Sequence, residues 1–364
     1  MRLRKMKFLS LTISGFRNID DVSMNLDARH VIFIGENGQG KTNLLESLYL
    51  SCYGSSFRTR RTSQLIGFGK ERAKITVRIQ EQDAVHTVEA LLQQGSISMN
   101  IDKKEISDRM ELMNRFPCIV FTHEDIAFVK GAPQEKRRFF DQTMCLHDPL
   151  FLYDLRRYHR ILKQRNQALK DQRLSLMPTY DEQLAHIGIT IQQQRSKTAE
   201  EFNKLFPELF SRVSGMDDPP IMDYRPSWGS TATRDEVKKK LSDTLSRDLR
   251  FLTTTSGPHR DRFICKKGSA DFSQTASTGQ LRLISLALRA AQATYYKNKT
   301  GRLPVLLLDD VLLELDHGKR QRFIQELSGY EQAVCTFLPE EVYGHEQQFS
   351  DVLNYTVSKG NAYQ

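Results

Sequence analysis

Cysteine is scarce in this sequence, and long apolar runs are absent. The five cysteines among 364 residues are odd in number and never form a C-x-x-C pair, which speaks against a structural zinc site or a disulfide framework. No apolar run approaches the roughly 18 residues that a membrane helix needs. The basic start of the chain also lacks the continuous apolar stretch of a secretory signal. We therefore expect a soluble protein of a reducing cytoplasm, without a membrane partner.

Positive charge is in excess. The chain has 53 Lys and Arg against 44 Asp and Glu, which gives a formal net charge of +9. Such a balance favours a polyanionic partner, either nucleic acid or an anionic membrane surface. The length suggests two or three domains, and a hydrophobic content of 39% is sufficient for a sizeable core.

The hydrophobic pattern divides the chain into two α/β ends and a helical middle. We expect strands at residues 7–14, 24–26 and 31–34 and within 74–101, and a helix at 42–52. Helical spacing follows at 139–173, 180–206 and 235–250, and after these come strand character beyond Thr253, a helix at 279–296 and a strand at 305–308. The predicted division is an N-terminal part of a nucleotide-binding head (1–115), an inserted mainly helical lobe (116–235) and a C-terminal part of the head (236–364).

A glycine-rich loop lies between the apolar strand at 31–34 and the helix at 42–52. It fits the pattern G-x-x-x-x-G-K-[ST] and consists of Gly35, Glu36, Asn37, Gly38, Gln39, Gly40, Lys41 and Thr42. Such a loop points backbone N–H groups at phosphate oxygens, beside the positive end of the helix dipole. We expect Lys41 to neutralise the β- and γ-phosphates of ATP, and the Thr42 hydroxyl to ligate Mg²⁺.

Two adjacent carboxylates follow the buried strand at 305–308. Asp309 and Asp310 emerge at its carboxyl end, where ligands bind in open α/β sheets. We expect Asp309 to act on Mg²⁺ and Asp310 to polarise the attacking water as a general base. Thr42 and Asp309 lie 309 − 42 = 267 residues apart, so a large segment must interrupt the nucleotide fold. A helical insertion is the layout of ABC/SMC heads, and this insertion is too short for a long coiled-coil arm.

A third motif precedes the helix at 279–296. Ser277, Gly279 and Gln280 are similar to the S-x-G-Q core of the ABC signature, which faces the γ-phosphate bound by the opposite subunit. A serine hydroxyl and a glycine N–H at a helix start can bind an anion, although an ordinary helix cap uses the same residue types. If the motif is a signature, ATP is held between two protomers, and Asp316 reaches across their interface as part of a D-loop.

These motifs, together with others in the same order, resemble the bacterial RecF family over nearly the whole chain. The further motifs are Ser14–Asn18, Ser56–Arg58, Phe121–Asp125, Val129–Pro133, Arg137–Arg138, Arg157–Asn166 and Gly257–Asp261. The resemblance implies an ABC/SMC-like P-loop head of α/β class, with a mixed sheet, flanking helices and an inserted compact helical lobe. It also implies a cytoplasmic protein of recombinational DNA repair and replication that binds DNA, dimerises on ATP and hydrolyses it slowly. Such a protein would act with RecO and RecR at single-stranded gaps or junctions, help to load RecA and support the SOS response.

Two positions depart from that family. Leu281 stands where a polar Gln or Glu is usual, and Leu313 where the D-loop usually has Ser, while Thr336 is a candidate switch residue. These departures motivate an alternative, an ATP-gated DNA clamp whose hydrolysis is vestigial. An ATPase subunit of a membrane transporter would share the P-loop and the signature, but not the insertion or the further motifs.

Clustered basic residues are the candidates for DNA contacts. The clusters are Arg2–Lys7, Arg58 with Arg60 and Arg61, Lys136–Arg138, Arg156–Arg165 and Lys238–Lys240. A solvated helix face is the better explanation of any one cluster taken alone. Among the clusters we favour Arg58, Arg60 and Arg61 for DNA because they follow the P-loop helix. No recognition helix or aromatic stacking motif is visible, so sequence-specific reading is not expected. His123 either lies near the nucleotide or caps a turn.

Overall fold

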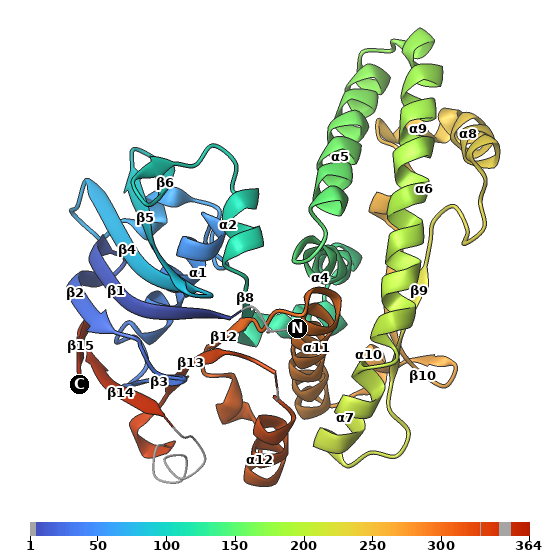
Figure 1. Cartoon of the computed structure of the whole chain (residues 1–364). Helices are drawn as coiled ribbons and strands as arrows, with labels where there is room; N and C mark the ends of the chain where they lie inside the picture. Colours follow the sequence, from blue (N-terminus) through green and yellow to red (C-terminus); the bar gives the residue numbers. More distant parts are fainter. Residues whose placement is uncertain (1–4, 328, 342–350) are drawn as a thin grey trace. The chain divides into compact units, whose positions relative to one another are not determined.

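The computed structural model describes residues 5–327, 329–341 and 351–364. The chain folds into two compact units (Figure 1). The first, which we call the head unit, combines residues 1–125 with 288–364, and the second, the inserted unit, contains residues 126–287. These units divide the chain at other positions than the three segments expected from the sequence, and that three-part division stays a prediction. Arg2 and Arg4 of the first basic cluster lie outside the described residues.

An antiparallel sheet forms one part of the head unit. Its strand order is β2-β1-β4-β5-β6-β7. The strands are β1 (Met6–Phe16), β2 (Ile19–Asn25), β4 (Arg72–Glu81), β5 (Ala84–Gln93), β6 (Ser96–Ile101) and β7 (Lys104–Glu105). Alternate residues of β1 and β4 are buried, among them Leu11, Ile13, Val77 and Ile79. This period of two is the pattern that predicted strands at 7–14 and within 74–101, and both predictions are confirmed.

A second, mostly parallel sheet carries the nucleotide motifs. Its order is β15-β14-β3-β13-β12-β8, with only β14 and β15 antiparallel. The strands are β3 (His30–Ile34), β8 (Cys118–Phe121), β12 (Val305–Leu308), β13 (Gln332–Phe337), β14 (Val352–Ser358) and β15 (Asn361–Tyr363). Every residue of β8, β12 and β13 is buried, as expected for central strands covered on both faces. The carboxyl ends of β3, β12 and β13 meet at one edge.

Helix α1 (Lys41–Tyr53) packs against both sheets. It contacts β1, β4 and β5 of the antiparallel sheet and β8 and β13 of the parallel one. Contact on both sides explains why ten of its thirteen residues are buried, including the polar Glu46, Ser47 and Ser51. The remaining described helices of the head unit are α2 (Met110–Arg115), α12 (His317–Glu326), the end of α11 (Thr278–Thr300) and the short 3₁₀ helices Thr62–Leu65, His123–Ile126, Val311–Glu314 and Pro339–Glu341.

The inserted unit is mainly helical. Its helices are α3 (Ala127–Lys130), α4 (Pro133–Cys145), α5 (Pro149–Lys170), α6 (Met177–Phe202), α7 (Phe206–Ser214), α8 (Arg234–Asp243), α9 (Leu245–Phe251), α10 (Phe272–Thr275) and the start of α11. A small antiparallel sheet has the order β11-β10-β9, from Ala270–Asp271, Arg262–Lys267 and Ile221–Arg225. Long α5 and α6 pack side by side (Figure 1). The short connection 171–176, with the 3₁₀ helix Leu174–Leu176, makes them an antiparallel pair.

One expected helix is divided in two, so the prediction of a continuous helix at 139–173 is wrong. Helix α4 ends at Cys145 and α5 begins at Pro149. Asp148 caps the new helix, because its side chain accepts hydrogen bonds from the N–H groups of Leu150 and Phe151 at 2.9 and 3.2 Å. Proline at the first helical position fits the same start. The stretch 235–250 is likewise divided, into α8 and α9.

Two buried arginines organise the core of the inserted unit. Arg165 is fully buried and donates to Asp181 and Asp248, each at 2.7 Å. Arg195 donates to Asp141 and to Asp261, the latter at 2.9 Å. Buried charges of this kind are retained only when paired and hydrogen-bonded. The grouping of Arg165 with a surface cluster is therefore wrong, since Arg160 of α5 is exposed whereas Arg165 of the same helix is buried.

Candidate nucleotide site

The glycine-rich loop runs from the end of β3 to the start of α1. Gly38 and Gly40 have φ angles of +80° and +115°, which only glycine adopts without strain. In the described part of the chain, the backbone N–H groups of Gly38, Gly40, Lys41 and Thr42 have no hydrogen-bond acceptor. No side chain caps α1 either. Free amides at the positive end of a helix form a site for an anion.

Lys41 lies inside this loop. Its side chain is only 3% exposed, and Nζ donates to the carbonyl oxygens of Gly35 and Glu36 at 2.6 and 3.3 Å. The nearest carboxylate is that of Asp310, at 3.7 Å. Apart from Asp310, neutral carbonyls hold this buried ammonium, so a phosphate in the loop would gain charge-assisted hydrogen bonds from it.

The loop is braced from outside by two turns. Gln39 accepts two hydrogen bonds from the hairpin turn between β14 and β15: its Oε1 from the N–H of Lys359 at 2.7 Å and its carbonyl from the N–H of Gly360 at 2.9 Å. Asn18, in the turn between β1 and β2, donates to the carbonyl of Gly38 at 3.4 Å and accepts from Asn43 at 2.7 Å. Neither turn was predicted from the sequence to contact the site. The hairpin lies 320 residues beyond Gln39 in the chain, and no local pattern connects the two.

The acid pair stands next to the loop. Thr42 donates its hydroxyl proton to Oδ1 of Asp309 at 2.7 Å. Burial raises the pKa of Asp309 to about 6, and the hydrogen bond from Thr42 opposes that shift. The buried Asp309 carboxylate and the Thr42 hydroxyl hydrogen-bonded to it form a pair of oxygen donors suited to Mg²⁺.

Asp310 is fixed by Thr336 at the end of β13. The Thr336 hydroxyl donates to Oδ1 of Asp310 at 2.7 Å and accepts from the backbone N–H of Asp310 at 2.7 Å. Asp310 itself has φ +54°, a left-handed conformation that is unusual for a residue other than glycine. A non-glycine residue held in this region by two hydrogen bonds fits a functional position at the strand end.

His123 follows β8 by two residues. Its charge when protonated would lower the pKa of Asp309, which places its ring within electrostatic reach of the acid pair. The same turn is anchored by Asp125, whose carboxylate accepts from Arg289 of α11 at 2.7 and 3.0 Å and from the N–H of Thr122 at 2.9 Å. Both expected roles of His123, beside the nucleotide or as the cap of a turn, stay predictions.

The signature candidates lie at the start of α11, in the inserted unit. The Ser277 hydroxyl accepts from the N–H of Gln280 at 3.3 Å, and the Gln280 side chain accepts from the N–H of Ser277 at 2.9 Å. This reciprocal pair is a capping box. A Cβ on Gly279 would meet no atom within 4 Å, so its backbone is open to a partner. In this structure the motif serves as a cap, and its binding role stays a prediction.

The departures from the family pattern have partial explanations. Leu281 is 2% exposed, so an apolar residue there fills the core. Asp316 caps α12 by accepting from the N–H of Lys319 at 2.9 Å and pairs with the ammonium of Lys319 at 2.6 Å. Its role across an interface stays a prediction. The side chain of Leu313 lies outside the described residues.

The three arginines proposed for DNA differ in their surroundings. Arg58 is 39% exposed and donates to Asn43 at 2.8 Å and to the buried Glu46 at 3.4 Å, a carboxylate that Arg17 also contacts at 2.8 Å. Arg60 and Arg61 are exposed. Glu46 was not singled out from the sequence, because a lone acid in an amphipathic helix normally faces solvent.

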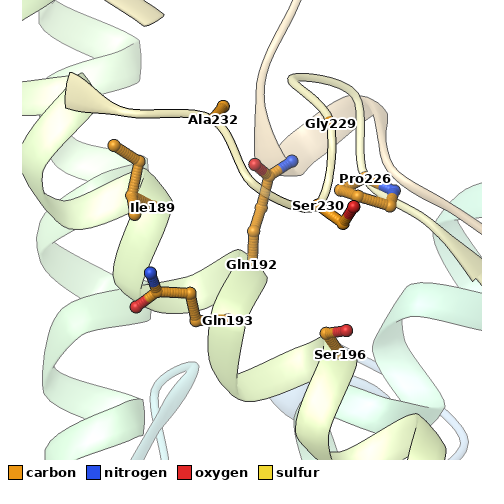
Figure 2. Close-up of a pocket in the computed structure, with 8 residues that line it drawn as sticks. All are labelled: Ile189, Gln192, Gln193, Ser196, Pro226, Gly229, Ser230 and Ala232. Carbon is orange, nitrogen blue, oxygen red and sulfur yellow. The ribbon is translucent and has the colours of Figure 1, made fainter. Parts of the chain in front are cut away.

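A small pocket elsewhere does not add to this site. It lies in the inserted unit between α6 and the loop 226–232 (Figure 2). Gln192 lines it, but its amide donates to Asp261 at 2.6 Å and so belongs to the Arg195 network. Among the described helices, none is long and apolar enough to cross a membrane.

Comparisons with known proteins agree on one group. Residues 7–359 match the family described as RecF/RecN/SMC N terminal domain. The chain is 40% identical to the DNA replication and repair protein RecF of Treponema pallidum (strain Nichols), over 92% of this chain and 94% of that one. It is 34% identical to the protein of the same name from Leptospira interrogans (serovar Lai), over 90% of each.

Solved structures give the same picture. A structure of the recombination mediator protein RecF with ATP, in the RecFOR pathway, is 25% identical and matches with a TM-score of 0.89 over 100% of this chain and 98% of that one. An SMC head bound to a domain of ScpA is 15% identical with a TM-score of 0.57, covering 98% and 96%. The second likeness concerns the fold alone.

Proposed function

Because the chain belongs to the bacterial RecF family of DNA replication and repair proteins, we propose that it is an ATP-dependent DNA-binding protein of recombinational repair. The observation that carries this proposal is the 2.7 Å hydrogen bond between Thr42 and Asp309, which brings the two halves of a nucleotide site together. We place the protein in the cytoplasm, in agreement with its five buried, unpaired cysteines.

ATP and Mg²⁺ fit the residues of this loop. Bound there, the nucleotide would supply a triphosphate whose terminal bond can be hydrolysed and whose charge the loop can hold. Lys41 would exchange its contacts with the carbonyls of Gly35 and Glu36 for phosphate oxygens, beside the free amides of Gly38 and Gly40. Thr42 and Asp309 would ligate the metal and its waters. The positive charge of the metal would offset the free energy needed to keep the buried Asp309 ionised.

Asp310 is the proposed general base. Thr336 orients its carboxylate, whose other oxygen lies 3.7 Å from the Lys41 ammonium, and the carboxylate would accept a proton from the attacking water. An ATP-gated clamp with vestigial hydrolysis remains the second candidate, favoured by the apolar Leu281 in the signature. Asp310→Asn separates them: loss of turnover and delayed DNA release support hydrolysis, and unchanged turnover and release support the clamp.

We further propose that ATP joins two protomers. The open backbone at Gly279 and the Ser277 hydroxyl would face the nucleotide of the partner, as anion-binding groups at a helix start. Such a dimer would act with RecO and RecR at gaps or junctions, where its basic surface meets DNA.

A DNA-binding titration with and without ATP tests the proposed function. Single-stranded, blunt duplex and gapped DNA would be compared at several salt concentrations. We expect binding that ATP strengthens, that has no base preference and that weakens steeply with salt, because phosphate contacts release counterions. Equal affinity with and without ATP on every substrate would contradict the proposal.

A further inference from the structure

The aromatic side chain of Phe68 projects from the head unit, three residues after the 3₁₀ helix Thr62–Leu65. Phe68 is 106% exposed, whereas the next most exposed large apolar side chain among the described residues, Leu150, is 73% exposed. Phe68 therefore contributes no burial to the fold. A phenylalanine in a tight turn is unusual, since turns favour small and polar residues.

The turn that presents Phe68 is well anchored. The N–H of Gly67 donates to the carbonyl of Gly15 at 2.8 Å, and the N–H of Lys70 closes the turn on the carbonyl of Gly67 at 3.0 Å. Gly69 has φ +73°, as the third position of a type II turn requires. A Cβ on Gly67 would lie 3.0 Å from the carbonyl of Arg17, so the turn sits directly against the β1–β2 connection. The ring is thus held in solvent by a fixed backbone.

The same surface is strongly basic. Between residues 58 and 72 the chain has five cations, Arg58, Arg60, Arg61, Lys70 and Arg72, and one acid, Glu71. In the described part of the chain, Arg60 and Arg61 have no ion-pair partner. Unpaired cations beside an exposed ring suit a ligand with both negative charge and flat apolar faces.

Contacts connect the turn to these cations. The backbone N–H of Arg17 donates to the carbonyl of Leu65, at the end of the 3₁₀ helix that follows Arg61, at 2.9 Å. The guanidinium of Arg17 shares Glu46 with Arg58. The 3₁₀ helix after Arg61 and the turn of Phe68 are therefore both held against the β1–β2 connection, within the same short segment as the cations.

We propose that Phe68 is a stacking platform for an unpaired DNA base, while Arg60 and Arg61 bind the neighbouring phosphates. This rests on the proposed DNA-binding function and specifies the DNA that the site prefers. Bases inside a duplex are already stacked on one another, so a base left open in single-stranded DNA, in a gap or at a junction reaches the ring without the free energy needed to unstack a duplex step. DNA is favoured over a protein partner because residues 58–72 carry five cations against one acid, an excess that suits a polyanion.

Phe68→Ala is the direct test, measured as the dissociation constant for fluorescent DNA with ATP and Mg²⁺ present. The substrates are a single strand, a gapped duplex and a duplex closed by hairpins at both ends. Because stacking contributes about 1–3 kcal/mol per base, we expect binding to the first two substrates to weaken about fivefold to hundredfold. The closed duplex should bind as before, and Phe68→Trp should retain the preference.

Two control variants make the result specific. Phe251→Ala removes a 57% exposed phenylalanine of the inserted unit. It should leave the dissociation constants for all three DNA substrates unchanged. Arg60→Ala combined with Arg61→Ala should weaken binding to all substrates. It should also lower the slope of log affinity against log salt by about 0.7–0.9 for each phosphate that the protein no longer neutralises. Phe68→Ala should leave that slope unchanged, because it removes no charge.

Several outcomes would overturn the proposal. Unchanged binding of Phe68→Ala to single-stranded and gapped DNA would remove the stacking role. An equal loss on the closed duplex, or a loss of ATP-driven dimers with DNA affinity intact, would make Phe68 a folding or protein-interface residue instead. A wild-type protein that binds none of the substrates would refute the proposed function itself, a result distinct from the first two.

Discussion

The hydroxyl of Thr42 donates a 2.7 Å hydrogen bond to the carboxylate of Asp309, across 267 residues of sequence. This contact exists because β3 and β12 lie in one sheet with β13 between them, so that the loop after β3 and the acids after β12 share an edge. The relationship is the basis of the predictions that follow.

Loss of the Lys41 ammonium should abolish ATP-driven dimers and leave the fold intact. A hydrogen bond to a charged group contributes about 1.5–3 kcal/mol, so Lys41→Ala should weaken ATP binding about tenfold to more than hundredfold. Isothermal titration and light scattering measure the two effects. Lys103→Ala, in the exposed turn between β6 and β7, is the matched control. A Lys41→Ala protein that still dimerises with ATP would remove the assigned role.

Asp309 should make the nucleotide-free protein less stable at high pH. Its pKa is raised from 3.8 to about 6 in the folded state, so the stability it contributes is present below about pH 4 and lost as the pH rises through 6. Asp309→Asn keeps an acceptor for Thr42 without the charge. We expect this variant to be more stable than wild type at pH 8, by up to about 3 kcal/mol, and equal near pH 4. Denaturant unfolding at both pH values measures the difference, and equal stability at pH 8 would contradict it.

Gly360 should be required for the brace on the P-loop. A Cβ there would lie 2.0 Å from the carbonyl of Asn18, so Gly360→Ala must shift the turn that holds Gln39. We expect ATP affinity to fall about tenfold or more, since small displacements of a binding loop are costly. Gly95→Ala is a close control, because Gly95 has φ +78° against +77° for Gly360 but no atom near its Cβ. Similar ATP affinity in both variants would show that the brace does not act on the nucleotide.

His259 should make the inserted unit sensitive to acid. Its Nε2 donates to the carbonyl of Thr254 at 2.9 Å and its Nδ1 accepts from Tyr158 at 2.7 Å, and burial lowers its pKa from 6.5 to about 4. The unfolded chain therefore binds more protons between these values, so stability is full above pH 6.5 and falls by up to about 3 kcal/mol toward pH 4. His259→Gln should flatten this part of the stability profile, whereas His186→Gln, at an exposed position on α6, should not. An unaltered profile in His259→Gln would contradict the assignment.

Several elements of the head were predictable because they carry a simple local pattern, which is a wholly apolar run for β3 and β12 and a regular period for β1, β4 and α1. Val305–Leu308 is a strand with the predicted bounds, and α1 differs from its predicted range by one residue at each end. The break between α4 and α5 was missed because helical spacing continues across it. Its signals were the capping Asp148 and Pro149, both visible in the sequence.

Long-range contacts of the site were harder to predict from the sequence. The glycine-rich loop and the acid pair Asp309–Asp310 could be assigned to one site because their spacing follows a known layout. That layout gives no indication that Gln39 contacts Lys359. The burial of Arg165 depends on Asp248, 83 residues away, and no local pattern reports that pairing. Phe68 was missed because one phenylalanine between two glycines carries no periodic signal, and only the fold shows that it is exposed.

Light scattering of the wild-type protein with ATP and Mg²⁺, beside Asp309→Asn, tests the central claim most directly. The account predicts that ATP doubles the wild-type mass from the 42.1 kDa of one chain, and that the variant stays at that mass. A wild-type protein that remains monomeric with saturating ATP, or a variant that dimerises as readily, would contradict it.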